Sequence, residues 1–419
     1  MRITLLTYGS RGDVQPFVAL ARRLIERGHK IKLAGPHRFA GFAGEHSVPF
    51  IPLAGDPGEI SRRFNDAGTN SLRMVAKMQD YVQSIAGEVA RSAFAACEEA
   101  DLIVHSFLFT TGAHSLARRM GIPDVSAQLF PMFLPTTEFP NVAVPGMPPG
   151  PLSYFTHWMA NQIFWYGGKS SYKRLRKQDP GIFPVKLYWP FKESAIRSRT
   201  PVLGAWSPSV LPRPHDWQAD AIHITGYWFL DSGEGYQPPA ELADFLAAGE
   251  PPVCITFGSM IHRQADRIAL DVMTAISKVG VRAVVLTGWQ AWNVEPRENV
   301  LFLGDAAHAW LFPRCKLVVH HGGAGTTAAV LRAGVPSIVV PFAGDQLFWA
   351  RRLHALGVAP VPIRVKELSV QRLEEALLEA GDSAISRRAE LLGGKIEGED
   401  GAGQAAAFIE NHAGRRRIL

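Results

Sequence analysis

Residues 317–346 read LVVHHGGAGTTAAVLRAGVPSIVVPFAGDQ, and this stretch decides the predicted fold around it. Residues 317–320 predict a short buried strand, and the glycines that follow open a loop directly before a helix. A glycine ends that helix, and residues 337–340 predict a second strand. A proline then begins a loop that presents Asp345 and Gln346. The stretch is therefore a strand, a glycine loop, a helix and a strand.

The predicted helix start suits an anion, most simply a phosphate, because its backbone N–H groups are unpaired and its dipole is positive there. Gly323 and Gly325 let the backbone approach a ligand closely. Thr326 and Thr327 can add hydroxyl donors, and His321 can donate from a ring nitrogen to a phosphoryl oxygen. The motif is neither G-x-x-x-x-G-K-[ST] nor G-x-G-x-x-G, which disfavours a P-loop ATPase and a nicotinamide dehydrogenase. The alternative is a tight glycine turn without a ligand.

The run HHGGAGTT followed by GVPSIVVPFAGDQ resembles the donor-binding signature of the family 1 glycosyltransferases that use UDP-sugars. The resemblance is to the bacterial and fungal branch, which includes sterol glucosyltransferases and the glycosyltransferases of glycopeptide and macrolide antibiotics. It covers both halves of the chain. It implies an α/β protein of GT-B fold, in which two Rossmann-like, doubly wound parallel-sheet domains face each other across a cleft.

Length and composition agree with a two-domain globular protein. The 419 residues are enough for two domains of about 200 residues each. Hydrophobic residues make up 47% and charged residues 20%, which are ordinary values. The net charge of +6 invites a nucleic-acid partner, but the basic residues are scattered and match no nucleic-acid motif. We therefore expect no nucleic-acid partner.

The cellular location is predicted from the cysteines and the apolar runs. The 3 cysteines lie far apart without metal-ligand or redox spacing, which indicates buried thiols in a reducing compartment. The apolar run after Arg2 is too short for a signal-peptide core, and no apolar stretch reaches the ~18 residues of a spanning helix. We expect a cytoplasmic protein, with peripheral membrane contact as an alternative. The sequence does not predict an oligomeric state.

The predicted domain organisation follows the GT-B resemblance. Residues 1–230 form an acceptor-binding domain, and the proline- and glycine-rich residues 231–239 form a linker. Residues 240–400 form the domain that binds the nucleotide sugar. Residues 401–419 form a helix and tail that return to the first domain.

The resemblance places the catalytic base in the first glycine turn, after a predicted strand at residues 3–8. Residues 12–16, GDVQP, align with the Gly-His-Val-Asn-Pro of plant members. Asp13 therefore stands where their histidine removes the proton of the acceptor hydroxyl, and the antibiotic and sterol branches also carry Asp there. The alternative is that Asp13 only caps the following helix.

His105 stands where plant members have an aspartate that orients their catalytic histidine. The resemblance therefore predicts a catalytic pair of Asp13 and His105, with the two residue types exchanged. A structural role for His105 is one alternative, because a histidine at a strand end is often structural. Another interpretation uses His114 on the next helix.

Residues 130–166 are predicted to determine acceptor specificity. Proline-rich residues precede LSYFTHWMANQIFWYGG, whose apolar side chains recur at helical spacing. The aromatic excess suits a cleft for a flat, lipophilic acceptor. A core helix is one alternative, and a surface resting on an anionic membrane is another, because lysines and arginines follow at residues 169–177. The predicted acceptor-binding residues are Ser10, Phe107, Phe130, Phe133 and Trp158.

Two further loops complete the predicted phosphate and sugar site. Gly258 and Ser259 lie where a predicted strand at residues 252–258 meets a loop, and family members use this turn to contact the donor phosphates or sugar. The alternative is an ordinary Gly-Ser turn. Asp345 and Gln346 stand where members hydrogen-bond the hydroxyls of glucose, and a carboxylate and an amide can together bind adjacent hydroxyls. The alternative for this pair is plain solvation of the loop.

Residues 301–311, LFLGDAAHAWL, match the segment with which family members hold uracil through backbone groups. Ala306 and Ala307 are the predicted contacts. Plant enzymes stack a tryptophan on the base, but this chain has Asp305 at that position, and Trp310 is a candidate for the core instead. The sequence therefore leaves purine and thymine donors open beside uracil.

Together these features predict an inverting glycosyltransferase that moves a sugar, most simply glucose from UDP-glucose, to a hydroxyl of a lipophilic acceptor. A sterol, a triterpenoid or a polyketide natural product would fit. The chain has no D-x-D motif, so we expect no metal and no cofactor besides the nucleotide-sugar co-substrate. The alternatives are a GT-B nucleotide-sugar epimerase, a lipid-precursor glycosyltransferase and a catalytically silent partner protein that binds a nucleotide sugar.

Overall fold

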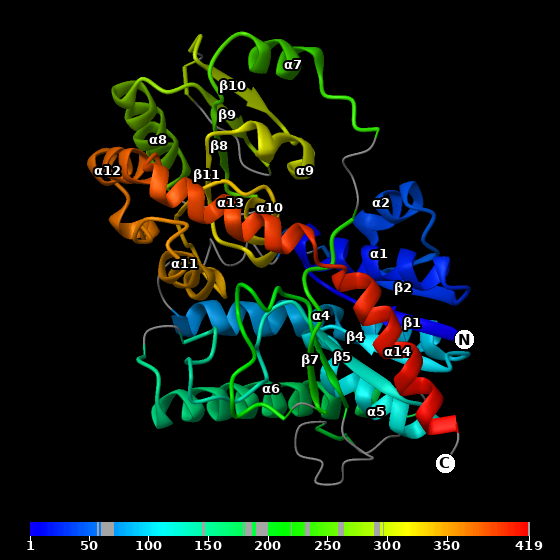
Figure 1. Ribbon diagram of the computed structural model, residues 1–419. Coiled ribbons are helices and arrows are strands. Elements are labelled where there is room, and N and C mark those ends of the chain that lie inside the picture. Colours follow the sequence, from blue (N-terminus) through cyan, green and yellow to red (C-terminus); the bar gives the residue numbers. More distant parts are fainter. Residues whose placement is uncertain are drawn as a thin grey trace. The chain divides into compact units, whose positions relative to one another are not determined.

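The computed structural model divides the chain into two compact units (Figure 1). It describes residues 1–56, 58–59, 71–144, 147–178, 180, 187–189, 200–218, 220–230, 235–258, 264–288, 294–295 and 297–417. The first unit comprises Met1–Pro208, Pro212–Leu230 and Asp400–Leu419, and the second comprises Ser209–Leu211 and Asp231–Glu399. Within the described part of the chain, no helix combines the length and the apolar character needed to cross a membrane.

The first unit is built on a parallel sheet with the strand order β3-β2-β1-β4-β5-β6-β7. Its strands are β1 (Arg2–Leu6), β2 (Lys30–Pro36), β3 (Phe50–Leu53), β4 (Leu102–His105), β5 (Asp124–Gln128), β6 (Val202–Gly204) and β7 (Ile222–Ile224). Its helices are α1 (Arg11–Glu26), α2 (Ala40–Glu45), α4 (Ser71–Cys97), α5 (Thr110–Met120), α6 (Pro151–Gln178) and α14 (Gly401–Arg417), with short 3₁₀ turns at His37–Phe39 and Phe107–Phe109.

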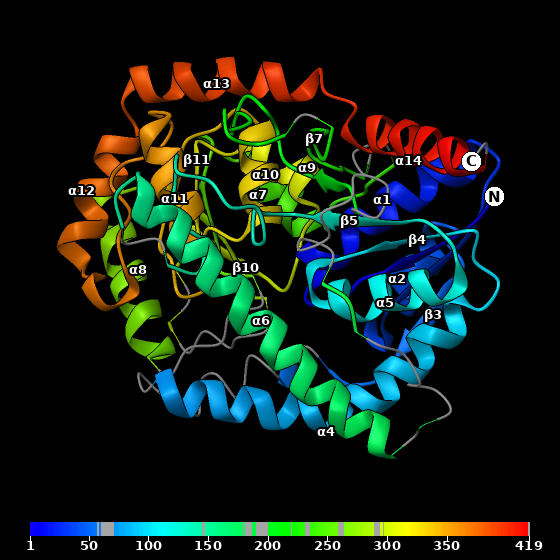
Figure 2. The same ribbon diagram turned by 90° about the horizontal axis from the view of Figure 1, so that it is seen from below.

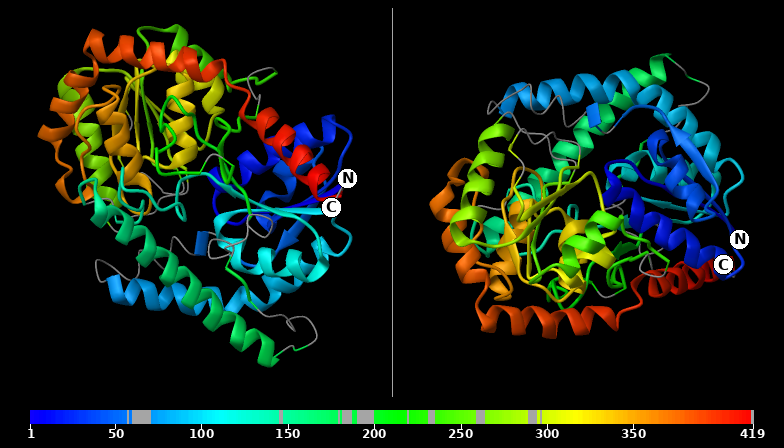
Figure 3. Two further views of the ribbon diagram at one scale, coloured as in Figure 1. Left: turned by 60° about the horizontal axis from the view of Figure 1, so that its bottom comes forward. Right: turned by 90° about the horizontal axis from the view of Figure 1, so that it is seen from above.

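Helices cover both faces of this sheet, so β4 and β5 are buried at every position, as expected for parallel strands inside a sandwich of helices. On one face, Phe17 and Leu20 of α1 share a core cluster with Ala405 and Ile409 of α14. On the other face, the core cluster includes Cys97 at the end of α4 and residues of α5. Figures 1 and 3 show α14, in red, lying along α1, in dark blue. Figure 2 shows α6 crossing beside α4.

The second unit has a smaller parallel sheet with the order β10-β9-β8-β11-β12. Its strands are β8 (Val253–Thr256), β9 (Ala283–Leu286), β10 (Val300–Leu303), β11 (Leu317–His320) and β12 (Ser337–Val339). Its helices are α7 (Ala240–Ala247), α8 (Ala265–Val279), α9 (His308–Leu311), α10 (Ala324–Arg332), α11 (Gln346–Ala355), α12 (Val370–Ala380) and α13 (Ser383–Glu397), with 3₁₀ turns at Phe312–Arg314 and Val365–Glu367.

Both sheets reverse their strand order beside the first strand of the unit. In the first unit the chain runs outward from β1 to β3 and then returns to place β4 beside β1. In the second it runs from β8 to β10 and returns to place β11 beside β8. Ligands of open parallel sheets bind at the carboxyl ends of the strands where the order reverses. The prediction of two doubly wound α/β units is confirmed, and the reversals mark where each unit offers a site.

Gly401, the first residue of α14, packs closely against backbone of the first unit. A Cβ at Gly401 would lie 2.4 Å from the Tyr227 carbonyl oxygen and 2.6 Å from the Gly226 carbonyl oxygen. Because backbone cannot yield easily, we expect Gly401→Ala to lower the free energy of unfolding by about 1–3 kcal/mol. The control is Gly41→Ala in α2, where a Cβ meets nothing within 4 Å. Chemical denaturation that shows equal stability for the two variants would contradict this packing.

Candidate active site

Asp13 lies in the first turn of α1 with its carboxylate turned back toward the residue that caps the helix. The backbone N–H of Ser10 donates to Asp13 Oδ2 over 2.8 Å, and the Ser10 hydroxyl donates to the same oxygen over 3.1 Å. These contacts form a capping box. No described residue donates a hydrogen bond to Asp13 Oδ1. One oxygen therefore caps the helix, and the other is available to a ligand.

The turn before α1 has room for this carboxylate only because residue 9 is glycine. Gly9 has a φ of +143°, and a Cβ there would lie 2.2 Å from Asp13 Oδ2. Burial raises the pKa of Asp13 from 3.8 to about 6, although the hydrogen bonds from Ser10 oppose the rise. The carboxylate is thus a stronger base than an ordinary aspartate and is still mostly ionised at neutral pH.

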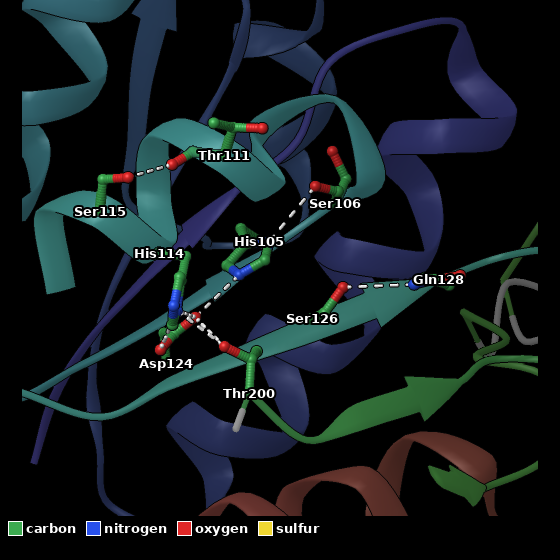
Figure 4. A network of polar contacts seen from close by, with 9 residues as sticks. All are labelled: His105, Ser106, Thr111, His114, Ser115, Asp124, Ser126, Gln128 and Thr200. Carbon is green, nitrogen blue, oxygen red and sulfur yellow. Dashed lines mark hydrogen bonds and ion pairs between the residues drawn. The ribbon is translucent and has the colours of Figure 1, made fainter. Parts of the chain in front are cut away.

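His105 contacts the carboxylate of Asp124, whereas the sequence predicted a pair with Asp13 (Figure 4). Its Nε2 lies 3.1 Å from Asp124 Oδ2, and its Nδ1 lies 3.4 Å from the carbonyl oxygen of Ser106. His114 of α5 approaches the same carboxylate, with Nδ1 3.1 Å from both oxygens. The Thr200 hydroxyl donates to Asp124 Oδ2 over 2.8 Å. These four side chains are all buried.

Asp124 is ionised in this buried network. Burial alone would raise its pKa, but the hydrogen bonds from His105 and His114 hold the pKa of this carboxyl well below its usual range. Among the described residues, no hydrogen bond joins His105 to Asp13, so the structure does not bring the predicted pair together. His105 instead fixes the end of β4, from which the loop carrying Phe107 begins.

Three of the predicted acceptor residues form one aromatic cluster. The ring centroid of Phe107 lies 5.2 Å from that of Phe130 and 6.4 Å from that of Phe133. Phe164 of α6, which the sequence did not single out, lies 6.2 Å from Phe107 and 5.0 Å from Phe133. Phe133 is 1% exposed and forms the back of the cluster. Phe107 and Phe130 are half-buried, so these two can contact a ligand.

Trp158 lies apart from this cluster. It is 50% exposed on α6 and stacks on Phe155, with ring centroids 5.5 Å apart. Phe164 follows Trp158 by six positions, a rotation of about 600° along an α-helix, which places the two rings on different faces. The apolar stripe that the sequence suggested for the core is therefore largely on the outside of α6, and the structure does not place Trp158 with the other predicted acceptor residues.

In the second unit, the ring of His321 occupies space that two glycines leave empty. A Cβ at Gly323 would lie 2.5 Å from His321 Nε2, and a Cβ at Gly258 would lie 3.0 Å from His321 Cε1. Gly258 itself has a φ of +61°. A third glycine, Gly288 after β9, would meet the Gly258 carbonyl oxygen at 2.2 Å if it carried a Cβ. The sequence analysis missed Gly288, whose signal is a glycine two residues after a buried strand. Ser259 lies outside the described residues.

His321 is neutral and has an unsatisfied nitrogen. Burial, and to a smaller extent the nearby His308, lower the pKa of His321 to about 4, although a hydrogen bond to the Thr256 backbone opposes the shift. Its Nδ1 is buried without a hydrogen-bond partner among the described residues. A buried polar atom without a partner is costly unless a ligand or water meets it. The atom therefore fits a bound group at this loop.

The two adjacent histidines have different roles. Nδ1 of His320 accepts the Gly322 N–H over 3.1 Å, and burial lowers the pKa of His320 to about 3. His320 thus shapes the loop, because its neutral ring accepts a bond from the turn. A Cβ at Gly322, whose φ is +86°, would lie 2.7 Å from Val339 Cγ1. The loop is therefore fixed from both sides. Among the described residues, Nε2 of His320, like Nδ1 of His321, is buried without a hydrogen-bond partner.

The start of α10 has the geometry that the sequence predicted. Gly323 is its N-cap, and the Thr327 N–H donates to the Gly323 carbonyl over 2.9 Å. The preceding N–H groups of the first turn have no acceptor within the helix. The Thr327 hydroxyl is buried without a hydrogen-bond partner among the described residues, and Thr326 is half-buried beside the exposed Gly325. The helix start can bind an anion.

The predicted sugar-binding pair is partly used by the protein itself. Oε1 of Gln346 accepts the N–H groups of Phe342, over 2.7 Å, and of Ala343, over 3.0 Å. The Trp349 indole N–H donates to Asp345 Oδ2 over 2.9 Å. These hydrogen bonds orient both side chains of the pair. The sequence analysis missed Trp349, which lies one helical turn beyond Asp345.

The predicted base-binding segment also uses part of its backbone internally. The Ala306 N–H donates to Asp305 Oδ1 over 2.9 Å. The Ala307 carbonyl accepts the Trp310 and Leu311 N–H groups over 3.0 and 2.9 Å. The Trp310 ring, half-buried, packs 5.7 Å from the ring of Tyr236, another residue of this unit. The remaining polar backbone groups of this pair are the Ala306 carbonyl and the Ala307 N–H.

Each of the two units contains a segment that matches a known protein family. Residues 3–115 match the glycosyltransferase family 28 N-terminal domain, and residues 298–392 match the erythromycin biosynthesis protein CIII-like, C-terminal domain. A sterol 3-beta-glucosyltransferase of Arabidopsis thaliana is 32% identical over 427 residues, which cover 98% of this chain and 68% of that protein. Another, of Neurospora crassa, is 36% identical over 430 residues, which cover 98% of this chain and 27% of that protein.

The chain thus spans about a quarter of the length of the Neurospora protein. A solved structure of the glycotransferase of kitacinnamycin superimposes with a TM-score of 0.72 at 20% identity and covers 98% of each chain. The fold is that of the GT-B glycosyltransferases. The chain belongs to the glycosyltransferase family that contains the sterol 3-beta-glucosyltransferases.

The buried network around Asp124 should be a large contributor to stability. Asp124→Asn removes the charge that two buried histidines face, so we expect a loss of about 3–5 kcal/mol in the free energy of unfolding at neutral pH. The folded pKa of Asp124 is depressed, so this contribution is present above the unfolded pKa of 3.8 and is lost as the pH falls through the folded value.

The matched control is Asp101→Asn, which removes a half-exposed ion pair of 3.2 Å with Arg2. Such a surface pair contributes about 0–1 kcal/mol. Urea denaturation at several pH values measures both variants. If Asp124→Asn lowers the free energy of unfolding no more than the control does, the charge of Asp124 does not stabilise the network.

Proposed function

We propose that this chain transfers glucose from UDP-glucose to a hydroxyl of a sterol or a similar lipophilic acceptor, with inversion at the anomeric carbon and with Asp13 as the general base. The observation that carries the proposal is the carboxylate of Asp13 itself. It lies at the carboxyl end of β1, one oxygen is fixed by Ser10, and its pKa is raised to about 6. The names of the relatives support the acceptor class.

In the proposed step, the acceptor oxygen forms a bond to the anomeric carbon while the bond from that carbon to the diphosphate oxygen breaks. UDP leaves with the bonding electron pair, and the acceptor proton passes to Asp13 Oδ1. A hydroxyl is a very weak acid, so the proton moves as the new bond forms. Attack from the side opposite the leaving group converts an α-linked donor into a β-linked product.

The leaving group gains negative charge in this step, and the second unit has groups that can stabilise it. We assign the diphosphate to the start of α10 and to His321, whose Nδ1 is buried without a partner among the described residues. The charge of a diphosphate favours the protonated ring, so donor binding should raise the pKa of His321 from about 4. These groups would take the place of a divalent metal, in keeping with the absence of a D-x-D motif from the sequence.

The remaining assignments follow the same geometry. Asp345 and Gln346 would bind the glucose hydroxyls, and the backbone of Ala306 and Ala307 would contact the base. Phe107 and Phe130 would contact the acceptor, since their rings are half-buried.

A donor and acceptor panel tests the activity. The purified chain is incubated with UDP-glucose, dTDP-glucose and GDP-glucose against sterol, triterpenoid and macrolide acceptors, and products are read by mass spectrometry. We expect a hexosyl sterol from UDP-glucose, with a β-linkage by NMR. No product from any pair, or an α-linked product, would contradict the proposal. A donor-only incubation that releases free sugar or an epimer would instead favour a hydrolase or an epimerase.

Replacing the base should stop turnover without loss of fold. Asp13→Asn keeps an oxygen that can accept the Ser10 N–H, but it cannot take a proton, so we expect turnover to fall roughly a hundred- to ten-thousandfold. UDP affinity by calorimetry should not change, because Asp13 lies in the first unit and the phosphate groups lie in the second. Turnover equal to that of the wild type would remove Asp13 from the mechanism.

Changing the phosphate loop should weaken donor binding. A charge-assisted hydrogen bond from His321 to a phosphate is worth about 1.5–3 kcal/mol, so His321→Ala should weaken UDP binding roughly tenfold to a hundredfold. Gly323→Ala should weaken it too, since the new Cβ would lie 2.5 Å from His321 Nε2. Gly394→Ala in α13, where a Cβ meets nothing within 4 Å, is the control. Calorimetry that gives one affinity for all variants would refute the phosphate role.

A further inference from the structure

Helix α6 exposes a continuous set of large apolar side chains. Each of them is at least half exposed, which is unusual for aromatic and branched aliphatic residues on a globular protein. We call these residues the outer face of α6: Leu152 (60%), Tyr154 (50%), Phe155 (53%), Trp158 (50%), Ile163 (64%) and Tyr166 (62%). Phe155 and Trp158 are stacked with an interplanar angle of 23°.

In the first three turns of α6, the buried side is mostly polar, which is the reverse of an ordinary amphipathic helix, while Ala160, Phe164 and Leu175 add apolar contacts farther along. Ser153, Thr156, His157 and Asn161 are between 0% and 7% exposed. Nε2 of His157 lies 3.0 Å from the Phe139 carbonyl oxygen.

Further hydrogen bonds anchor the same buried face. The Thr156 hydroxyl accepts the Asn141 N–H over 2.8 Å, and the Ser153 hydroxyl donates to the Pro148 carbonyl over 2.9 Å. Rotation of α6 to bury its apolar residues would break these bonds. The orientation of the helix is therefore specified by polar contacts, and the apolar outer face is a built feature.

Basic residues continue the outer face along the second half of the helix. Lys169 and Lys173 lie 14 and 18 residues after Phe155, close to whole numbers of turns of about 3.6 residues, so they fall on the same stripe. Arg176 and Lys177 follow one turn later, and all four are exposed. The 28 residues of α6 include no aspartate or glutamate. The stripe is thus apolar and aromatic at one end and purely basic at the other.

We propose that the outer face of α6 binds an anionic phospholipid surface, with the aromatic end in the headgroup boundary and the basic end on the lipid phosphates. Tryptophan and tyrosine favour that boundary, and an aromatic face next to lysines and arginines is the pattern of helices that lie on membranes. A second copy of this helix is a poor partner, because the basic end meets no acidic residue on α6. The proposal goes beyond the transfer reaction and does not require it.

Vesicle sedimentation tests the proposal with the full chain and no sugar donor. We expect the wild type to bind phosphatidylcholine vesicles that contain phosphatidylserine at least tenfold more strongly than pure phosphatidylcholine vesicles, and the binding to weaken with salt. The double variant Phe155→Ser/Tyr166→Ser should lose at least tenfold in binding at any salt concentration. Lys169→Gln/Lys173→Gln should lose the preference for phosphatidylserine. Both variants should unfold at the wild-type temperature, because the altered side chains are exposed.

The matched control is Leu378→Ser/Leu391→Ser, which removes two apolar side chains of α12 and α13 that are 68% and 62% exposed. This control should bind vesicles like the wild type. Failure of the wild type to bind anionic vesicles, or equal losses in the α6 variants and the control, would overturn the proposal. A dimer in sedimentation velocity that only the α6 variants abolish, without vesicle binding, would show that the face is a protein interface instead. None of these outcomes bears on glucosyl transfer, which is assayed with detergent-solubilised acceptor.

Discussion

In each unit, the absence of a Cβ atom makes room for the ionisable side chain on which the proposed chemistry depends. Gly9 leaves the space that Asp13 Oδ2 fills, and Gly258 and Gly323 leave the space that the ring of His321 fills. Burial favours the neutral form of both groups, so it raises the pKa of Asp13 and lowers the pKa of His321. Backbone conformation thus determines where each group lies and how readily it exchanges a proton.

The sequence predicted the features that are encoded locally. The glycine loop, the helix after it and the strands on either side are continuous in residues 317–346, and their periodicity and glycines specify them without tertiary information. The candidate role of Asp13 came from resemblance to known enzymes, while its capping box depends only on Ser10, three residues before it. These are short-range features, and the structure reproduces the predicted elements.

The sequence could not predict contacts that depend on sheet register or on which helix face is buried. His105 meets Asp124 rather than Asp13, because β4 and β5 pair with Ile103 opposite Asp124 and bring that carboxylate within reach. For α6, the sequence left open an acceptor cleft, a core helix and a surface on an anionic membrane, because periodicity alone does not show which face is buried. The hydrogen bonds of His157 and its neighbours fix the orientation of the helix, and no periodicity in the sequence reveals them.

The pH dependence of kcat/KM tests the central claim most directly, because it reports the ionisation of the essential base in the free enzyme. If Asp13 is that base, the logarithm of kcat/KM should rise with unit slope against pH in the acidic range. It should level off above about pH 6, the pKa of Asp13. The residual activity of Asp13→Asn should lack this break. A profile that is flat across the acidic range, or the same break in Asp13→Asn, would contradict the account.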